Sequence, residues 1–277
     1  MERRQFIKYA AGAMVGACFC ESAEAFPNGL FRVFPSMLRM NPRLTGGPAH
    51  KYLKQGIEGK LKIQDDSKLH LALKSSTDFV YGSSGTRVTP QFVYAGALSE
   101  GLDEFMDKYP GLDAKKVDGF EYLGLQQFGT HAPALRLKGY LPEDFREGRR
   151  FELINRMNEK NEPVVSGRFR SFEDAILATT AEYAWRRDVL RADLPELGIH
   201  EKKFAGISID FWNYAYYIGG NGCGKAMLGH YAGKGILDKE AYVWDLPRSG
   251  YSRIHYLARE RMASLEVMNS MNRPIDS

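Results

Sequence analysis

The stretch SFEDAILATTAEYAWRRDVLR, residues 171 to 191, predicts a long α-helix. Ser171 is a favourable N-cap residue, and Asp174 follows three positions later, which is the spacing of a capping box. The apolar faces of this helix come from Phe172, Ile176, Leu177, Ala184 and Val189. A helix of this kind at the centre of the chain favours a mainly α fold.

Further helices are predicted on both sides of this stretch. Thr89 is an N-cap residue with Pro90 at the first helical position, and this helix runs to about Lys108. The remaining helices are expected at about 207–218, 224–232 and 251–268. Residues 26–88, which prolines interrupt, are predicted to form an irregular N-terminal extension with one candidate strand at Leu69–Leu73. The helical domain then covers residues 89–277.

The first 25 residues are typical of a twin-arginine export signal. Arg3 and Arg4 precede a short apolar stretch, and Ala23-Glu24-Ala25 offers small residues at signal-peptidase spacing. The apolar stretch is shorter than the about 20 residues of a spanning helix, so no transmembrane segment is expected after removal of the signal. We therefore expect a periplasmic or secreted protein, and lipidation at Cys18 is the alternative to cleavage.

Charge and cysteine content exclude several classes of function. The formal net charge of +4 suits an anionic polymer and does not require a nucleic-acid partner. Cys223 is the one cysteine beyond the signal, so no intramolecular disulfide is expected. The Cys and His residues lack zinc-site spacing, and we expect neither a metal nor a cofactor. This also argues against a cofactor-loaded redox protein.

Gly219–Lys225 matches most of a phosphate-binding loop, with sequence GGNGCGK. The next residue is Ala226, where that motif requires Ser or Thr to hold magnesium. The residues before the glycines also continue a helix and do not form a clean strand. We interpret the segment as a glycine-rich turn between two helices, which needs positive φ and close backbone packing.

Glu100 is the candidate catalytic residue. It falls inside the predicted helix from Thr89 and is followed by Gly101, which costs about 1 kcal/mol relative to alanine in a helix. Such a glycine suggests a close approach beside the carboxylate. Helical phase places Glu100 beside Val93 and Gly96. A solvated glutamate on a polar face is the alternative interpretation of this segment.

A second segment, Gly124-Leu-Gln-Gln-Phe-Gly129, resembles the Gly-Leu-Met-Gln stretch of lytic transglycosylases and the related stretch of phage-type muramidases. The resemblance, which extends from about Pro90 to Leu237, implies a lysozyme-like helical domain and a peptidoglycan glycan strand as substrate. It also implies that Glu100 is the general acid, although Gly101 stands where the muramidases carry serine. A lysozyme would need a second carboxylate, for which Asp118 and Glu121 are candidates.

The resemblance also suggests where the sugar would bind. Aromatic and amide side chains are the groups expected to contact it: Tyr122, Gln126, Gln127, Tyr216, Tyr217 and Asn221. Core packing with a satisfied hydroxyl is the alternative for each tyrosine. Arg186, Arg187 and Arg191 are interpreted as a solvated helix end.

Two functions remain open on the sequence. The first is an exported peptidoglycan-cleaving glycosidase, either a muramidase or a lytic transglycosylase. The second is a non-catalytic relative that binds peptidoglycan or serves as an accessory component of a secretion system, since the resemblance extends to a lysozyme-like family found beside secretion and injection genes.

Overall fold

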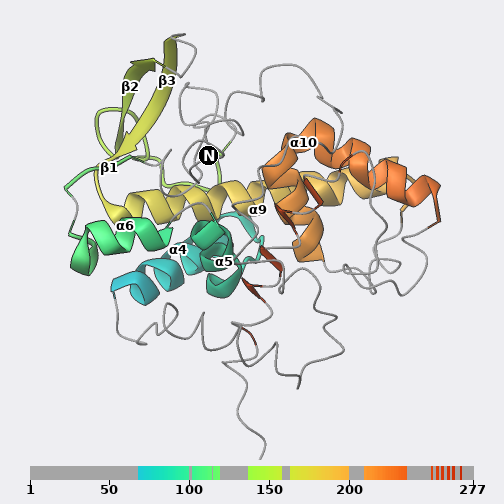
Figure 1. Cartoon of the computed structure of the whole chain (residues 1–277), viewed down its shortest axis with the longest axis horizontal. Coiled ribbons are helices and arrows are strands. Elements are labelled where there is room, and N and C mark those ends of the chain that lie inside the picture. Colours follow the sequence, from blue (N-terminus) through green and yellow to red (C-terminus); the bar gives the residue numbers. More distant parts are fainter. Residues whose placement is uncertain are drawn as a thin grey trace, which may run out of the picture. The chain divides into compact units, whose positions relative to one another are not determined.

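The computed structural model describes residues 68–99, 102–113, 115–118, 137–157, 163–199 and 209–235, with individual residues between Tyr251 and Asn269. The chain divides into two compact units, one holding Ile63–Trp185 and the other Arg186–Ser277, which we describe separately. Helices predominate among the described residues, so the predicted mainly α class is confirmed (Figure 1). None of the described helices is both long and apolar enough to cross a membrane.

The Ile63–Trp185 unit begins with helix α4, Lys68–Ser84. The prediction of a strand at Leu69–Leu73 is therefore wrong, and part of the extension predicted to be irregular is helical. The buried positions recur at helical spacing and belong to Leu69, Ala72, Leu73, Ser76, Thr77 and Val80. An apolar run of five residues is compatible with a strand or with a buried helix face. The buried residues of α4 recur every three or four positions, which is the spacing of a helix.

The next two helices are α5, Pro90–Ser99, and α6, Leu102–Lys108. The predicted N-cap is confirmed, because the backbone N–H of Phe92 donates to Thr89 Oγ1 at 3.2 Å. Glu100 and Gly101 stand between the two helices and lie outside the described residues. A 3₁₀ turn, η3 at Pro110–Leu112, follows α6.

A small antiparallel sheet was not predicted. Its strands are β1 at Val117–Asp118, β2 at Phe151–Met157 and β3 at Pro163–Phe169, in the order β1-β3-β2. Strands β2 and β3 pair from Phe151↔Phe169 to Met157↔Pro163. Residues 158–162 are rich in turn-forming and charged residues, and a β-rich run lies on each side of them. This pattern is typical of a hairpin, and a search for helical periodicity does not detect it.

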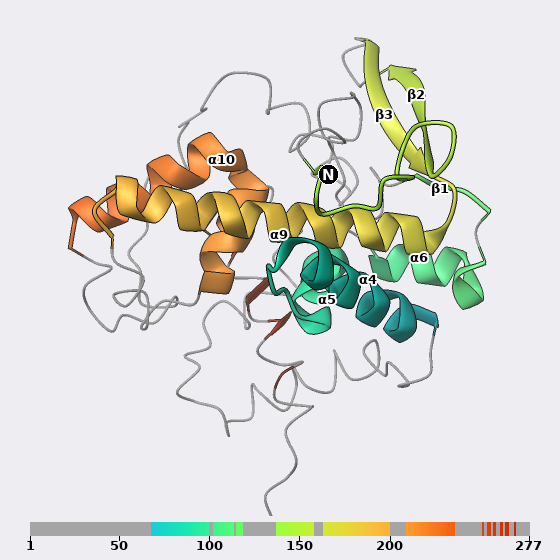
Figure 2. The same ribbon diagram turned by 180° about the vertical axis from the view of Figure 1, so that it is seen from behind.

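Helix α9, Phe172–Glu196, follows the sheet and continues from one unit into the other. The predicted N-cap is confirmed, because the backbone N–H of Asp174 donates to Ser171 Oγ at 3.0 Å. The reciprocal bond of a capping box is not formed, since the Asp174 carboxylate accepts from Arg150. Arg150 forms charge-assisted bonds to Asp174 and Asp144, both with contacts at 2.9 Å. In the Ile63–Trp185 unit, α4, α5 and α6 lie along the first half of α9 (Figure 2).

The Arg186–Ser277 unit is built on helix α10, Ile209–Gly233, which is broken at Gly220 (φ 70°, ψ 169°). A Cβ atom at Gly224 would lie 2.9 Å from the Cα of Tyr216. These residues would be about 12 Å apart along a straight helix, so the two limbs of α10 fold back on each other. The predicted glycine-rich turn between helices is thus confirmed, and the segment before it is helical.

Candidate functional site

The predicted acid, Glu100, lies outside the described residues. The nearest residues with described burial are Leu98, which is half-buried, and Leu102, which is buried. Ala97 precedes it with no exposed surface, and Leu102 and Phe105 follow it with none. Helix α5 is buried over the whole stretch from Phe92 to Ala97. Described residues on both sides of position 100 in the sequence thus belong to the apolar core of the Ile63–Trp185 unit.

Helices α5 and α9 approach each other closely at Gly96. A Cβ atom built on this glycine would lie 2.0 Å from the hydroxyl oxygen of Tyr183. The Tyr183 ring is fully buried and packs edge-on against Phe92, with ring centroids 5.0 Å apart. The Tyr183 side chain thus occupies the space that a larger residue at position 96 would need. This gives a physical reason for a glycine four residues before Glu100.

We expect Gly96→Ala to lower the free energy of unfolding by about 1 to 3 kcal/mol, because the new methyl group would overlap the buried Tyr183 ring. The new methyl group would also lie 2.7 Å from Cζ of Tyr183. Gly82→Ala on α4 is the matched control: nothing lies within 4 Å of its Cβ position. There the better helix propensity of alanine should stabilise the protein by up to about 1 kcal/mol. Equal denaturation midpoints for wild type and Gly96→Ala would contradict the close approach.

A second helix contact lies on the other side of Glu100. Phe105 on α6 stacks on Phe172 of α9, with centroids 5.9 Å apart and an interplanar angle of 12°. The chain thus contacts α9 at Tyr183 before position 100 and at Phe172 after it. Between these contacts α9 carries two fully buried threonines, Thr179 and Thr180, whose hydroxyls donate to carbonyls of their own helix at 2.8 Å.

Several other predicted residues of this unit also lie outside the described residues: Tyr122, Gln126, Gln127 and the candidate second carboxylate Glu121. The other candidate, Asp118, stands on β1 in register with Arg168. Glu152 pairs with the same arginine from β2. Lys116 contacts Glu152 at 2.9 Å and, with Arg168, lowers the pKa of that carboxyl. The backbone register therefore places Asp118 and Glu152 on either side of Arg168.

Tyr216 lies in the core of the Arg186–Ser277 unit. Its ring is fully buried, and its hydroxyl donates to Asp193 Oδ2 at 2.9 Å. Asp193 also accepts a bond from Lys225, whose Nζ lies 2.8 Å from Oδ1, and Lys225 pairs in addition with Glu196. This placement corresponds to the packing alternative for Tyr216, with its hydroxyl satisfied, and leaves no exposed ring face for a sugar.

Burial and, next, the hydrogen bond to Asp193 raise the pKa of Tyr216 well above its ordinary value. Because the raised pKa belongs to the folded state, its stabilisation is fully present below about pH 10, the ordinary pKa of tyrosine, and is lost as the pH rises further. The wild type should lose up to about 1.4 kcal/mol per pH unit through this residue. Urea denaturation between about pH 8 and pH 11 should show the stability difference between wild type and Tyr216→Phe shrinking above about pH 10. A difference that stays constant would show that the phenol ionises equally in both states.

Tyr217 and Asn221 are engaged in internal contacts as well. The guanidinium of Arg261 lies 5.1 Å from the ring centroid of Tyr217, at a cation–π distance, and Tyr217 is 8% exposed. Asn221, the first residue after the break in α10, accepts a hydrogen bond from Arg186. The three described members of the predicted sugar-binding set therefore make contacts within the Arg186–Ser277 unit.

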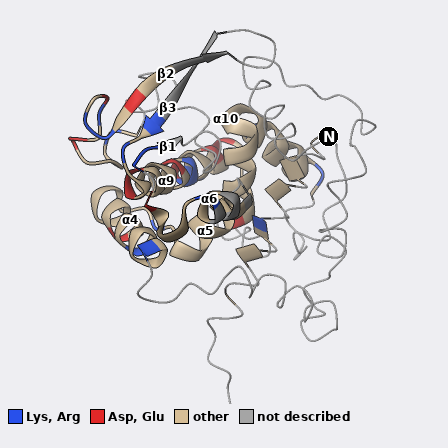
Figure 3. Ribbon diagram, turned by 60° about the vertical axis from the view of Figure 1, so that its left-hand side comes forward, with Lys and Arg blue, Asp and Glu red and all other residues tan. Residues whose placement is uncertain are grey.

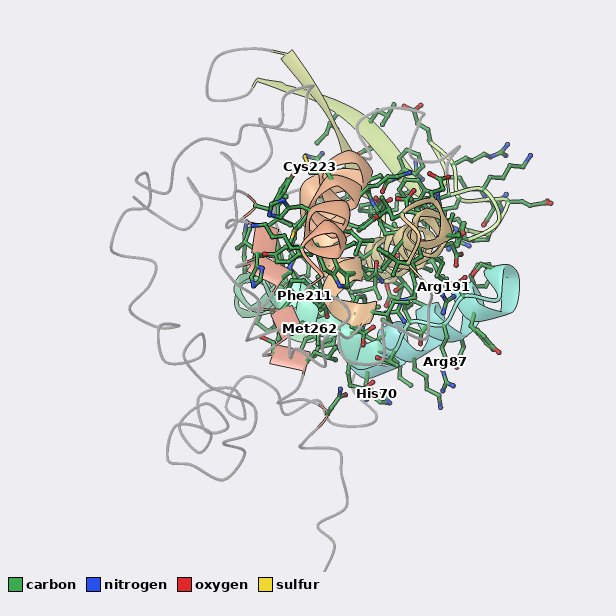
Figure 4. The ribbon with its side chains drawn as sticks, turned by 90° about the vertical axis from the view of Figure 1, so that its right-hand side faces the viewer. His70, Arg87, Arg191, Phe211, Cys223 and Met262 are labelled. Carbon is green, nitrogen blue, oxygen red and sulfur yellow. The ribbon has the colours of Figure 1, made fainter. Side chains whose placement is uncertain are left out.

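The prediction that Arg186 and Arg187 form a solvated helix end is wrong. Both are buried, at 5% and 8% exposure, and Arg187 forms an ion pair with Asp210. Arg191, whose side chain is 42% exposed, is the one that reaches solvent (Figure 4). Figure 3 shows charged residues of both signs along α9. Sequence reasoning missed this polar contact between α9 and α10, which pairs residues 20 to 40 positions apart and has no local signal.

The described residues also bear on the phosphate-binding motif and on metals. Lys225, the lysine of the motif, is bound to Asp193 and Glu196, and these bonds raise its pKa. Within the described ranges, no group of three or more His, Cys, Asp or Glu side chains comes together as a metal site. Comparisons with protein-family models, curated proteins and solved structures found no match to this chain.

Proposed function

We propose that the chain is an exported glycosidase with a lysozyme-like helical domain that cleaves the glycan strands of peptidoglycan. Glu100 is the general acid, and Tyr122, Gln126 and Gln127 contact the sugars. Tyr216, Tyr217 and Asn221 hold the structure of their own unit instead. The export signal supports this proposal, because it sends the chain to the compartment that contains the cell wall.

The observation that carries the proposal is the burial of the chain on both sides of Glu100. Glycoside cleavage needs a carboxylic acid that stays protonated until it donates to the leaving oxygen. Apolar surroundings raise the pKa of a carboxyl group and keep it protonated. Ala97, Leu102 and Phe105, each without exposed surface, flank position 100 in the sequence, and we expect the Glu100 carboxyl to lie among such side chains. A single carboxylate suffices in a lytic mechanism, where the sugar's own hydroxyl attacks the anomeric carbon.

Digestion of purified sacculi tests the proposal directly. The protein should release soluble muropeptides, and mass spectrometry of their ends distinguishes the two reactions. Anhydro ends identify a lytic transglycosylase, whereas reducing ends identify a muramidase. Sacculi that bind the protein without release of fragments would instead establish the non-catalytic alternative, a peptidoglycan-binding or secretion-system accessory protein.

A further inference from the structure

A cluster of rings buries His255 against both limbs of α10. The cluster consists of Phe211 and Trp212 on the first limb, Tyr231 on the second limb, and His255 from the C-terminal part of the chain. The imidazole of His255 lies 5.4 Å from the Phe211 ring and 5.9 Å from the Tyr231 ring, between centroids. His255 is 5% exposed, and Trp212 and Tyr231 have no exposed surface. Figure 4 labels Phe211 on this unit.

Tyr231 and His255 of this cluster are also joined by a hydrogen bond. The hydroxyl of Tyr231 lies 2.9 Å from Nδ1 of His255, and either of these atoms can donate in the neutral pair. The described C-terminal residues near His255 are helical and include the buried Ala258, Met262 and Leu265. His255 thus provides a hydrogen-bonded attachment of this part of the chain to α10, beside the apolar contacts of its neighbours.

We propose that His255 is a pH-sensitive latch, which holds the C-terminal residues on α10 while its imidazole is neutral and releases them when the imidazole is protonated. Burial among rings disfavours the charged form of histidine, whereas release into water allows it. Protonation therefore shifts the equilibrium toward the released state, by linkage. Histidine is the side chain whose ordinary pKa makes this shift accessible at mildly acidic pH.

Among the described residues, each element packed against His255 carries titratable groups. The first limb of α10 supplies Asp210, which is held by Arg187. The second limb supplies Tyr231 and also His230, whose ring lies 5.8 Å from that of Tyr231. The C-terminal part supplies Tyr251 and Arg261, and Arg261 brings a fixed positive charge to the rings of Tyr214 and Tyr217 in the same unit.

Acrylamide quenching of Trp212 tests the latch. Trp185 and Trp244 are first replaced by phenylalanine, so that Trp212 is the single reporter. The quenching constant should rise severalfold when the pH falls from about 7.5 to about 5, a range that spans the ordinary pKa of histidine. His255→Gln, which stays neutral, should abolish this rise, and His230→Gln, a histidine of the same surroundings, should retain it.

A second variant keeps the test decisive if His255→Gln fails to fold. Tyr231→Phe removes the hydrogen bond and leaves the imidazole, so it should move the midpoint of release to higher pH. Circular dichroism at neutral pH checks that each variant is folded. A wild type whose quenching does not change with pH overturns the proposal. A transition that survives in His255→Gln, or one that disappears in His230→Gln, overturns it equally.

Discussion

Replacing Glu100 by glutamine should reduce the release of muropeptides from sacculi by at least about a hundredfold, the size of effect that a general acid contributes. Glutamine keeps the shape and hydrogen-bonding ability of the side chain but has no proton to give to the leaving oxygen. Binding to sacculi should be retained, because the sugar contacts are unchanged. The loss should therefore appear in kcat with little change in KM.

Asp78→Asn is the matched control for this substitution. Asp78 is an exposed carboxylate on α4 and belongs to the same unit. The control protein should digest sacculi at the wild-type rate, and both variants should unfold at the wild-type midpoint. If the wild type and the Glu100→Gln variant are equally active, another residue donates the proton. That result would contradict the role of Glu100 as the general acid.

Replacing Asp193 by alanine should lower the free energy of unfolding by about 2 to 3 kcal/mol. The carboxylate accepts the buried hydroxyl of Tyr216 and also pairs with Lys225. Without it, the Tyr216 hydroxyl loses its acceptor in a place that water does not reach, and an unpaired buried hydroxyl costs far more than the hydrogen bond is worth in net terms. Chemical denaturation at neutral pH measures the loss.

Glu196→Ala serves as the control because it removes a partner of the same lysine at the surface. The side chain of Glu196 is 64% exposed, and surface ion pairs contribute little, so stability should change only slightly. The double variant Asp193→Ala with Tyr216→Phe should recover part of the loss, since no buried hydroxyl is then left without an acceptor. Equal losses for Asp193→Ala and Glu196→Ala would mean that the Tyr216 hydrogen bond contributes little.

The predictions that succeeded rest on short-range rules. Ser171 and Asp174 lie three residues apart, and Thr89 directly precedes Pro90, so the N-caps of α9 and α5 could be inferred from local sequence alone. The break at Gly220 follows from the same kind of rule, because glycine reaches positive φ without the steric cost that other residues meet. These signals need no knowledge of what packs against them.

The failed predictions at Leu69–Leu73 and at Arg186 and Arg187 concern positions where burial depends on distant parts of the chain. Leu69–Leu73 is too short to separate a strand from a helix, and the face that α4 buries decides in favour of the helix. The β2–β3 hairpin is a different case, because it is a local pair whose β-rich runs helical periodicity does not detect. Arg186 and Arg187 resemble a solvated pair because arginine is mostly exposed in proteins. Their burial depends on Asn221 and Asp210, which come from another helix.

By itself, the sequence determined that this protein is mainly helical, where α5 and α9 begin, and where α10 breaks, because capping and glycine conformations are decided within a few residues. Only the tertiary structure decided which polar side chains are buried and which residues they bond. Tyr216 bonds Asp193, Arg186 bonds Asn221, and Tyr183 packs against Gly96. These contacts form because folding brings together helices that are far apart in the chain. In these places the cost of burying a polar group or a bulky ring is offset by a partner that no local pattern identifies.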